Sequence, residues 1–245
     1  GVTVVKSSGS PGSGVDIKIR GVGTNGNNQP LYIVDGVQAS SYFIDPNNIE
    51  SIEILKDVSS AAIYGTRAAN GVVIITTKKG KSGAPKVEFD SYVSFNSIRK
   101  SYNLLDAEGY KSVHKQMFEN AGSALPSFVT APTAANTNWL DQILNDAVQT
   151  NYSIRVSGAS DNVNYSLAAN KVSEEGIVLG SDFGKKSLNL NLGFTKGKFS
   201  LNGGVTYAET NREGYKFSLR DAYHISPLIP IYDTNNTSGY GYATD

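Results

Sequence analysis

The sequence of 245 residues predicts two parts of different fold class, a small mixed α/β unit followed by long alternating β-strands. In the first part, residues 72–75 are four β-branched apolar residues in a row, which predicts a strand covered on both faces. Gly65 and Gly71 precede this strand, and glycine is expected where the backbone takes positive φ or approaches another backbone closely. In the second part, apolar and polar residues alternate, as in strands with one apolar face.

The first part is predicted to contain strands, turns and one short helix. The strands expected before the apolar run cover residues 2–5, 16–20 and 31–34. The pair Asp35-Gly36 predicts a tight turn. Residues 51–55 fit either a helix or a strand, because their apolar positions satisfy both periods. Asp57 is the expected N-cap of a helix over residues 58–64.

Five segments of about ten residues alternate in the second part: residues 86–95, 151–158, 163–170, 188–195 and 199–207. Short turns near Asp161 and Gly197 join two pairs of them, and longer polar segments separate the others. This arrangement is typical of a transmembrane β-barrel. A soluble β-sandwich also alternates, but here the polar face carries Asn, Ser, Thr and Gly, which favours a wet lumen. Five strands cannot close a barrel, since the smallest has about eight.

A long polar insert separates the first two of these strands. Asp106 is the expected N-cap of a helix over residues 107–120, which Gly122 ends. Residues 138–144 form a second, short amphipathic segment. The expected anchors of this segment are Trp139, Ile143 and Leu144.

The composition excludes several classes of function. Basic and acidic residues number 22 each, so the charge balance gives no sign of nucleic-acid binding. Cysteine is absent, which excludes disulfides and thiolate metal sites, and the two histidines, His114 and His224, lie far apart in the sequence. We therefore expect no metal site and no cofactor. No segment approaches the roughly 18 consecutive apolar residues of a membrane-spanning helix.

Patterns that could indicate an enzyme have simpler explanations. Residues 21–26 match G-x-G-x-x-G, but a strand rather than a helix follows them, which predicts an exposed loop instead of a nucleotide site. Glu50, Glu53 and Asp57 are close in sequence, but nothing indicates the cleft that a pair of catalytic carboxylates needs. We expect these three side chains to be solvated.

The last segment, residues 209–245, combines aromatic residues with Asn, Ser and Gly. Such residues suit the capture of a sugar or a peptide, and they equally suit packing within a loop. Both interpretations stay open for the four side chains that are ligand-facing candidates: Tyr215, Tyr223, His224 and Tyr232.

Four motifs follow one another in the first part. They are Asp16-Ile-Lys-Ile-Arg-Gly-Val-Gly23, Pro30-Leu-Tyr-Ile-Val-Asp-Gly-Val37, Ile49-Glu-Ser-Ile-Glu-Ile-Leu-Lys-Asp57 and the run from Ala61 through Tyr64-Gly-Thr-Arg67 to Gly80. In this order they resemble the plug domain of TonB-dependent outer-membrane transporters of the SusC/RagA type of the Bacteroidota. Asn138-Trp139 and residues 180–183 look like the early barrel of the same family.

This resemblance implies an α+β plug domain over residues 1–83, lacking its N-terminal part, followed by antiparallel transmembrane β-barrel strands and extracellular loops over residues 84–245. The family barrel has about 22 strands, so most of the wall would lie outside this chain. The positions that match the structural motif of the plug are Arg20, Asp35, Gly36, Tyr64, Gly65, Arg67, Asn70 and Gly71. Arg20 and Arg67 are expected to pair with carboxylates of the lumen. The loop apices expected to face the ligand are Thr24, Asn25, Asn27, Asn28, Gln29, Tyr42 and Phe43.

The resemblance also implies a function, the active import of an oligomeric nutrient across the outer membrane of a Gram-negative member of the Bacteroidota. The nutrient would be a glycan or a peptide, and no enzyme activity is expected. A SusD-like lipoprotein would form a lid, and TonB would pull on a segment upstream of Gly1. Outer-membrane lipid would surround the barrel. The alternative is a surface β protein or adhesin that binds glycan or protein without transport.

Overall fold

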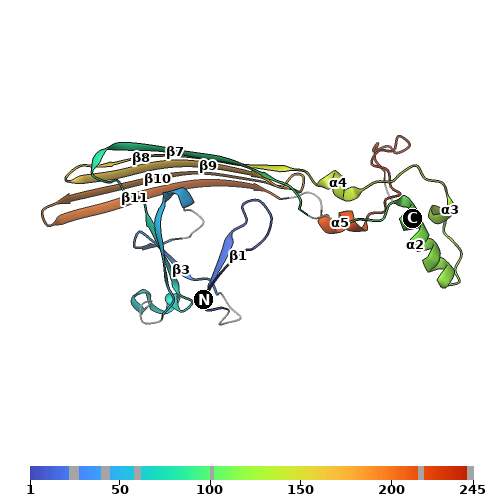
Figure 1. Cartoon of the computed structure of the whole chain (residues 1–245), viewed down its shortest axis with the longest axis horizontal. Helices are drawn as coiled ribbons and strands as arrows, with labels where there is room; N and C mark the ends of the chain where they lie inside the picture. Colours follow the sequence, from blue (N-terminus) through green and yellow to red (C-terminus); the bar gives the residue numbers. More distant parts are fainter. Residues whose placement is uncertain (22–27, 40–44, 58–61, 100–101, 215–217, 242–245) are drawn as a thin grey trace. The chain divides into compact units, whose positions relative to one another are not determined.

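The computed structural model describes residues 1–21, 28–39, 45–57, 62–99, 102–214 and 218–241 (Figure 1). The chain forms two compact units. Unit 1 comprises Gly1–Phe95, Val148–Glu175 and Asp182–Glu213, and unit 2 comprises Asn96–Ala147, Gly176–Ser181 and Gly214–Asp245. Among the described helices, none has both the length and the apolar character needed to cross a membrane.

Unit 1 begins with an antiparallel hairpin of β1 (Val2–Lys6) and β2 (Val15–Ile19). All five residues of β1 are exposed, and within the described residues its only partner strand is β2. In contrast, Ile19 at the end of β2 is buried. The two strands lie where the sequence predicts them, but only β2 contributes to a core.

A four-stranded sheet follows, in the order β4-β3-β6-β5. β3 (Leu31–Val34) runs parallel to β6 (Val72–Thr77), and β5 (Ile49–Leu55) pairs antiparallel with the other edge of β6. Residues 51–55 are therefore a strand. β3 leads into β4 (Val37–Gln38) through Asp35 and Gly36, whose φ angles of 49° and 88° are the two positive values that a type I′ hairpin turn requires.

The central strand β6 is covered on both faces, as its four β-branched residues predict. Val72 packs with Ile33 and Ala68 on one face. Val73, which is 1% exposed, packs with Ile19 on the other face. Successive side chains of a strand point to opposite faces, so an unbroken apolar run serves two cores at once.

Two short 3₁₀ helices, η2 (Pro46–Asn48) and η3 (Ala62–Ala68), connect these strands. The helix expected over residues 58–64 overlaps η3, but residues 58–61 lie outside the described part of the chain. Gly65 interrupts η3 with φ 70° and ψ −160°, which confirms the positive φ expected there.

Gly71 fulfils both expectations for a glycine at the start of a buried strand. Its φ is 88°. A Cβ at this position would lie 2.7 Å from Ile19 Cδ1 and 3.2 Å from the carbonyl oxygen of Leu55. A side chain at this position would have to displace Ile19 and would strain the backbone at this positive φ.

The second part of unit 1 is an antiparallel sheet with the strand order β11-β10-β9-β8-β7 (Figure 1). Its strands are β7 (Gly83–Asn96), β8 (Ala147–Ala159), β9 (Val163–Glu175), β10 (Asp182–Lys196) and β11 (Phe199–Glu213). They have 13 to 15 residues, so the predicted length of about ten was too short. Backbone groups make the ladder, and pairing therefore continues into polar flanks such as Lys171–Lys186.

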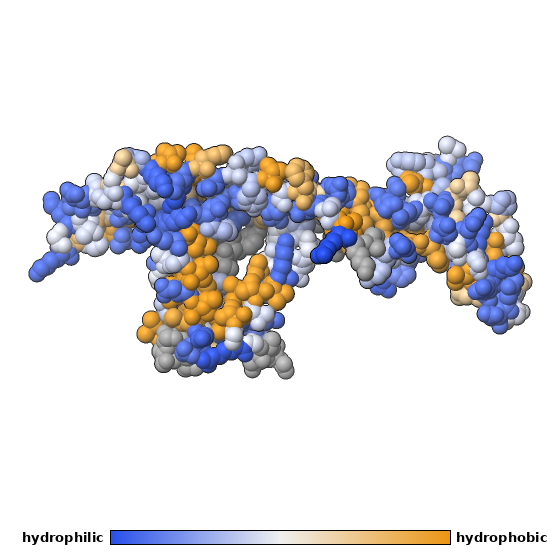
Figure 2. All heavy atoms as spheres, in the orientation of Figure 1, coloured by the Kyte–Doolittle hydropathy of each residue, from blue (hydrophilic) through white to orange (hydrophobic). Residues whose placement is uncertain are grey.

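The two faces of this sheet have the reverse of the usual burial. Residues on one face are apolar and exposed: Val87, Phe89, Val93, Tyr152, Ile154, Leu167, Leu188, Leu192, Leu201, Val205 and Tyr207. Residues on the opposite face are polar and buried: Asn151, Ser153, Ser157, Ser166, Asn170 and Ser187. Figure 2 shows apolar side chains at the surface along the strands. A soluble sandwich buries its apolar face, whereas a membrane barrel turns it outward, so the sheet is a barrel wall.

The described residues of unit 2 form four helices, α2 (Ala107–Asn120), α3 (Ser127–Thr130), α4 (Trp139–Ile143) and α5 (Leu219–His224). Asp106 caps α2 by accepting a hydrogen bond from the Gly109 N–H at 2.8 Å, as predicted. Leu140, Ile143 and Ala222 form the core of the unit, with Trp139 and Leu144 against it. All three predicted anchors belong to this core, and Leu140, the most buried residue, was missed.

Candidate functional site

The candidate site is the seam inside unit 1 where residues 1–80, the N-terminal part, meet the polar face of the five-stranded sheet. Asn191 Nδ2 on β10 donates a hydrogen bond to Thr77 Oγ1 at 3.3 Å. Thr77 in turn donates to the carboxylate of Asp35, from its backbone N–H at 2.9 Å and from its hydroxyl at 2.5 Å. A small cavity of about 50 Å³ lies beside these groups. Asp35 thus connects the turn after β3 to the end of β6 and, through Thr77, to the wall.

Buried polar groups continue the seam around η2. Asp45 is 3% exposed, and its Oδ1 accepts a hydrogen bond from the Asn47 N–H at 2.8 Å. Burial raises the pKa of Asp45 above its ordinary value of 3.8, although the Asn47 hydrogen bond and the charges of Lys185 and Lys78 oppose this shift. The ionised carboxylate is therefore held at a cost in stability.

Several side-chain atoms of the seam are incompletely paired. Within the described residues, Asp45 Oδ2, both polar atoms of the Asn48 amide, Ser187 Oγ and Asn189 Nδ2 are buried without a hydrogen-bond partner. Such groups subtract from the stability of an interface. The seam between the N-terminal part and the wall is thus polar, whereas the core of the N-terminal part around Val72 and Val73 is apolar.

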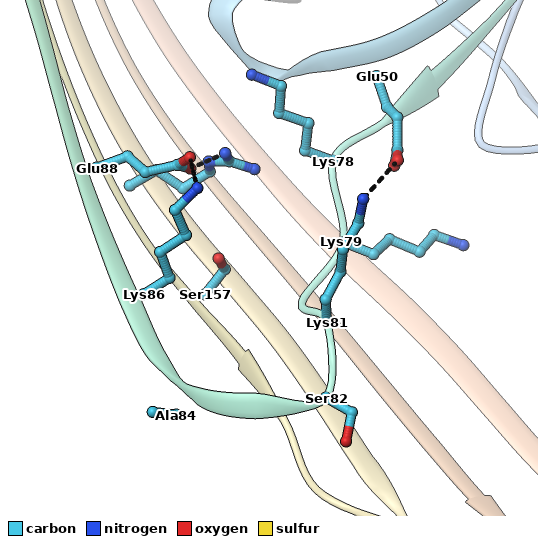
Figure 3. A pocket seen from close by; sticks show the side chains of 10 residues that line it. Glu50, Lys78, Lys79, Lys81, Ser82, Ala84, Lys86, Glu88 and Ser157 are labelled. Carbon is cyan, nitrogen blue, oxygen red and sulfur yellow. Dashed lines mark ion pairs between the residues drawn. The ribbon is translucent and has the colours of Figure 1, made fainter.

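A charged cavity of about 390 Å³ lies where the chain passes from β6 into β7 (Figure 3). Its lining includes Glu50, Lys78, Lys79 and Lys81 from the N-terminal part, and Lys86, Glu88 and Arg155 from the wall. Lys81 points to Glu50, with a distance of 3.4 Å between the charged atoms, and Lys86 Nζ lies 2.6 Å from Glu88 Oε1. Arg155 also pairs with Glu88.

These ion pairs differ in weight because they differ in exposure. The side chains of Arg155 and Glu88 are 12% and 25% exposed. The side chain of Lys81 is 85% exposed, and an exposed pair contributes at most about 1 kcal/mol. The Arg155–Glu88 pair, between β8 and β7, is therefore the main electrostatic contact of this cavity.

Gly80 brings the connecting segment close to the wall. A Cβ on Gly80 would overlap the carbonyl oxygen of Gly158 on β8 and lie 2.5 Å from that of Tyr165 on β9. Only glycine permits this approach of backbone to backbone.

Of the two arginines expected to pair with carboxylates, Arg20 does so and Arg67 binds a side-chain amide instead. Arg20 pairs with Asp57, and Arg67 Nη1 donates to the Gln38 side-chain amide at 2.6 Å. Both partners belong to the N-terminal part rather than to the wall. The sequence could not reveal this, because both contacts are long-range.

The other predicted motif residues have structural surroundings. Tyr64 packs on the core around Val72. Asn70 Nδ2 donates to the carbonyl of Gln29 at 3.4 Å. Gln29 is exposed and Asn28 half-buried. The candidates Thr24, Asn25, Asn27, Tyr42, Phe43 and Tyr215 lie outside the described residues.

The described loop candidates each contact a neighbouring group within unit 2. The ring of Tyr223 lies edge-on to Tyr102, with centroids 6.0 Å apart, and that of Tyr232 lies 5.7 Å from Tyr240. Tyr232 nevertheless remains 73% exposed. His224 Nδ1 lies 2.6 Å from the Arg220 carbonyl oxygen. Among the described residues, no three His, Cys, Asp or Glu side chains come together as a metal site.

Comparisons with known proteins agree with this arrangement. Residues 1–72 match the family model of the TonB-dependent receptor plug domain. The chain is 34% identical to the TonB-dependent receptor SusC of Bacteroides thetaiotaomicron, over 98% of this chain and 25% of that protein. It is 32% identical to the TonB-dependent receptor P3 of Formosa agariphila, over 94% of this chain and 23% of that protein. The chain thus spans about a quarter of the length of the curated relatives it matches.

A solved structure shares the same fold. In the closed-closed state of the RagAB peptide importer, one chain superposes with a TM-score of 0.78 at 25% identity, covering 89% of this chain and 28% of that one.

Proposed function

Because this chain belongs to the SusC/RagA type of TonB-dependent receptors, we propose that it forms the plug and the first wall strands of an active importer in the outer membrane. Residues 1–83 are the plug domain in this proposal, and residues 84–245 supply barrel strands and extracellular loops. The plug closes the lumen at rest. The cargo is an oligomeric nutrient, a glycan or a peptide, and its passage requires no covalent chemistry.

The observation that carries this proposal is the reversed burial of the five-stranded sheet. Apolar side chains such as Leu188 and Leu192 are exposed on one face, while Ser153, Ser166 and Asn170 are buried on the other. The exposed apolar face can contact lipid, and the buried polar face can contact the polar surface of the plug. A soluble adhesin would have to cover the apolar face by some other means.

The seam supports a plug whose apolar core stays folded when force acts on it. The contacts of the seam include the hydrogen bond from Asn191 to Thr77, and water can replace such a polar contact. The core around Val72 and Val73 is apolar and closely packed. Force transmitted by TonB would therefore separate plug from wall at a lower cost than it would break the plug core.

The partners follow from the same premise. TonB engages a segment on the N-terminal side of the plug, and a SusD-like surface lipoprotein covers the extracellular entrance. The exposed ring of Tyr232 is a candidate for ligand contact on that side, and so are Tyr223 and His224. The host is a Gram-negative member of the Bacteroidota.

The test compares uptake and binding in cells with and without TonB. The probes are a fluorescently labelled casein hydrolysate and fluorescently labelled malto-oligosaccharides. We expect cells lacking TonB to bind one probe at the surface and to accumulate none. Accumulation that survives loss of TonB would overturn the import proposal, and binding of a probe without uptake in either strain would favour the adhesin alternative.

A further inference from the structure

The apex of the β1–β2 hairpin contacts the wall through the backbone of Gly12. The Gly12 N–H donates a hydrogen bond to Glu174 Oε2 on β9 at 2.8 Å. The Gly12 carbonyl accepts a hydrogen bond from Arg212 Nη2 on β11. Two charged side chains from different strands therefore hold both polar backbone groups of one residue, and such charge-assisted hydrogen bonds are stronger than neutral ones.

The shape of the contact requires glycine. Gly12 has a φ of 61°, and a Cβ at this position would overlap the ring of Phe183 on β10. Phe183 is 6% exposed, and the Arg212 guanidinium carbon lies 5.7 Å from the centre of its ring. Phe183 thus forms the floor on which the hairpin apex lies.

The acidic partner is held from its other side. Glu174 Oε1 accepts a hydrogen bond from Gln149 Nε2 on β8 at 3.1 Å. The contact therefore involves four wall strands, β8 to β11, and residues of the wall hold both charged side chains, Gln149 for Glu174 and Phe183 for Arg212. We name Gly12, Phe183, Glu174 and Arg212 the Gly12 latch.

The chain on the two sides of the latch is held very differently. β1, on the N-terminal side, is exposed along its whole length. β2, on the C-terminal side, places Ile17 and Ile19 against the core around Val73. A pull from the N-terminal side meets the β1–β2 ladder and then the loop hydrogen bonds of Ser7 with Gly14 and of Ser8 with Ser13 before it reaches Gly12.

We propose that the Gly12 latch divides the plug into a first segment that is released under force and a remainder that stays on the wall. β1 peels from β2, beginning at the Val2–Ile19 pair and ending at the Lys6–Val15 pair, and the separation stops at Gly12. The inference rests on the proposed function, because it takes the force to act from the N-terminal side. It adds to that function the position, Gly12, at which the separation of β1 from β2 stops, and the latch residues that stop it.

The experiment is single-molecule force spectroscopy on the whole receptor in lipid nanodiscs, pulled from the N-terminal side of the plug. We expect a first event that ends at Gly12, so that the chain released between Gly1 and Gly12 measures about 40 Å when extended. A second event at higher force then follows. The double variant Glu174→Ala/Arg212→Ala is expected to lose the pause. The matched control Glu209→Ala/Arg220→Ala, which changes the same residue types outside the latch, is expected to keep it.

Two results would overturn the proposal: a first event that passes Gly12 without a pause, or a pause at unchanged force in the double variant. If the double variant does not insert, Gly12→Ala leaves both charged side chains in place and is expected to lose the pause as well. The assay uses neither TonB nor a nutrient, so its failure is independent of the uptake test. Uptake that does not need TonB would refute TonB-powered import, but it would not change the pause measured by force spectroscopy.

Discussion

The plug and the five-stranded wall bury opposite kinds of side chain. In the plug, Val72 and Val73 are the most buried large residues, and they are apolar. In the wall, the buried face carries Ser and Asn while Leu and Phe are exposed. The alternation of residues along the wall strands therefore suits two different surroundings. The exposed apolar face suits lipid outside the wall, and the buried polar face suits the polar seam with the plug on its inside.

The largest effect is expected from a charge in the plug core. Val73→Asp places a carboxylate where the native side chain is 1% exposed, and a buried unpaired charge costs more than about 4 kcal/mol. The plug should unfold inside an intact barrel, which limited proteolysis of the detergent-extracted receptor would detect. Val37→Asp, at an exposed valine of β4, is the matched control. Equal protease resistance of the Val73→Asp and Val37→Asp variants would contradict an apolar core around Val73.

The second effect tests the solvent of the wall. Leu192→Lys introduces a charge on the exposed apolar face and should cost about 2–4 kcal/mol if that face meets lipid. In water the same change would stay within about 0.5 kcal/mol. Folding yield into lipid vesicles, measured by heat-modifiable gel mobility, separates the two cases. Asn202→Lys, one strand away on the opposite face, is the control and should fold normally.

A smaller effect is expected in the charged cavity, where Arg155 on β8 pairs with Glu88 on β7. Arg155→Gln leaves Glu88 partly buried without its main partner, which should cost about 1–3 kcal/mol. Loss of a fully buried partner would cost more, but Glu88 is 25% exposed. Thermal denaturation of the receptor measures the change. Lys81→Gln, which breaks the exposed pair with Glu50, should shift stability by no more than about 0.5 kcal/mol. Equal losses of stability in Arg155→Gln and Lys81→Gln would contradict the claim that the less exposed ion pair contributes more.

The smallest effect concerns Asp45, whose pKa is raised by burial. Asp45→Asn keeps an oxygen that can cap η2 and removes the cost of burying a charge, so stability at pH 7 should rise by less than about 1 kcal/mol. The native plug should itself gain stability as the pH falls through the raised pKa, and the advantage of the variant should shrink as the pH approaches the ordinary pKa of 3.8. Thermal denaturation between pH 4 and pH 7 measures both. A less stable variant at pH 7 would mean that attraction to Lys185 and Lys78 outweighs burial.

Local signals in the sequence predicted most of the fold. The unbroken run at β6, the Asp35-Gly36 turn and the period-two strands of the wall each depend on residues close together in the chain. The strand lengths were underestimated, because ladder pairing in the polar flanks leaves no pattern in the side chains.

The seam was largely invisible in the sequence. Asp45 and Asn48 are buried, and nothing in the neighbouring sequence indicates this burial. Gly12 is an extreme case, since its partner Glu174 lies 162 residues away. Arg20 pairs with Asp57 inside the plug. This partner could not be predicted either, because residue spacing does not reveal which distant side chains pair. Roles proposed for the ligand-facing loops remain predictions.

The most direct test of the account is the environment of each residue along the middle of β10. The chain contains no cysteine, so single cysteines from Leu188 to Gly193 can carry nitroxide labels in the reconstituted receptor. Electron paramagnetic resonance then compares accessibility to oxygen and to a water-soluble nickel complex. The account predicts oxygen maxima at Leu188, Leu190 and Leu192, with period two. High nickel accessibility at these three positions, or no periodicity, would contradict a lipid-facing wall.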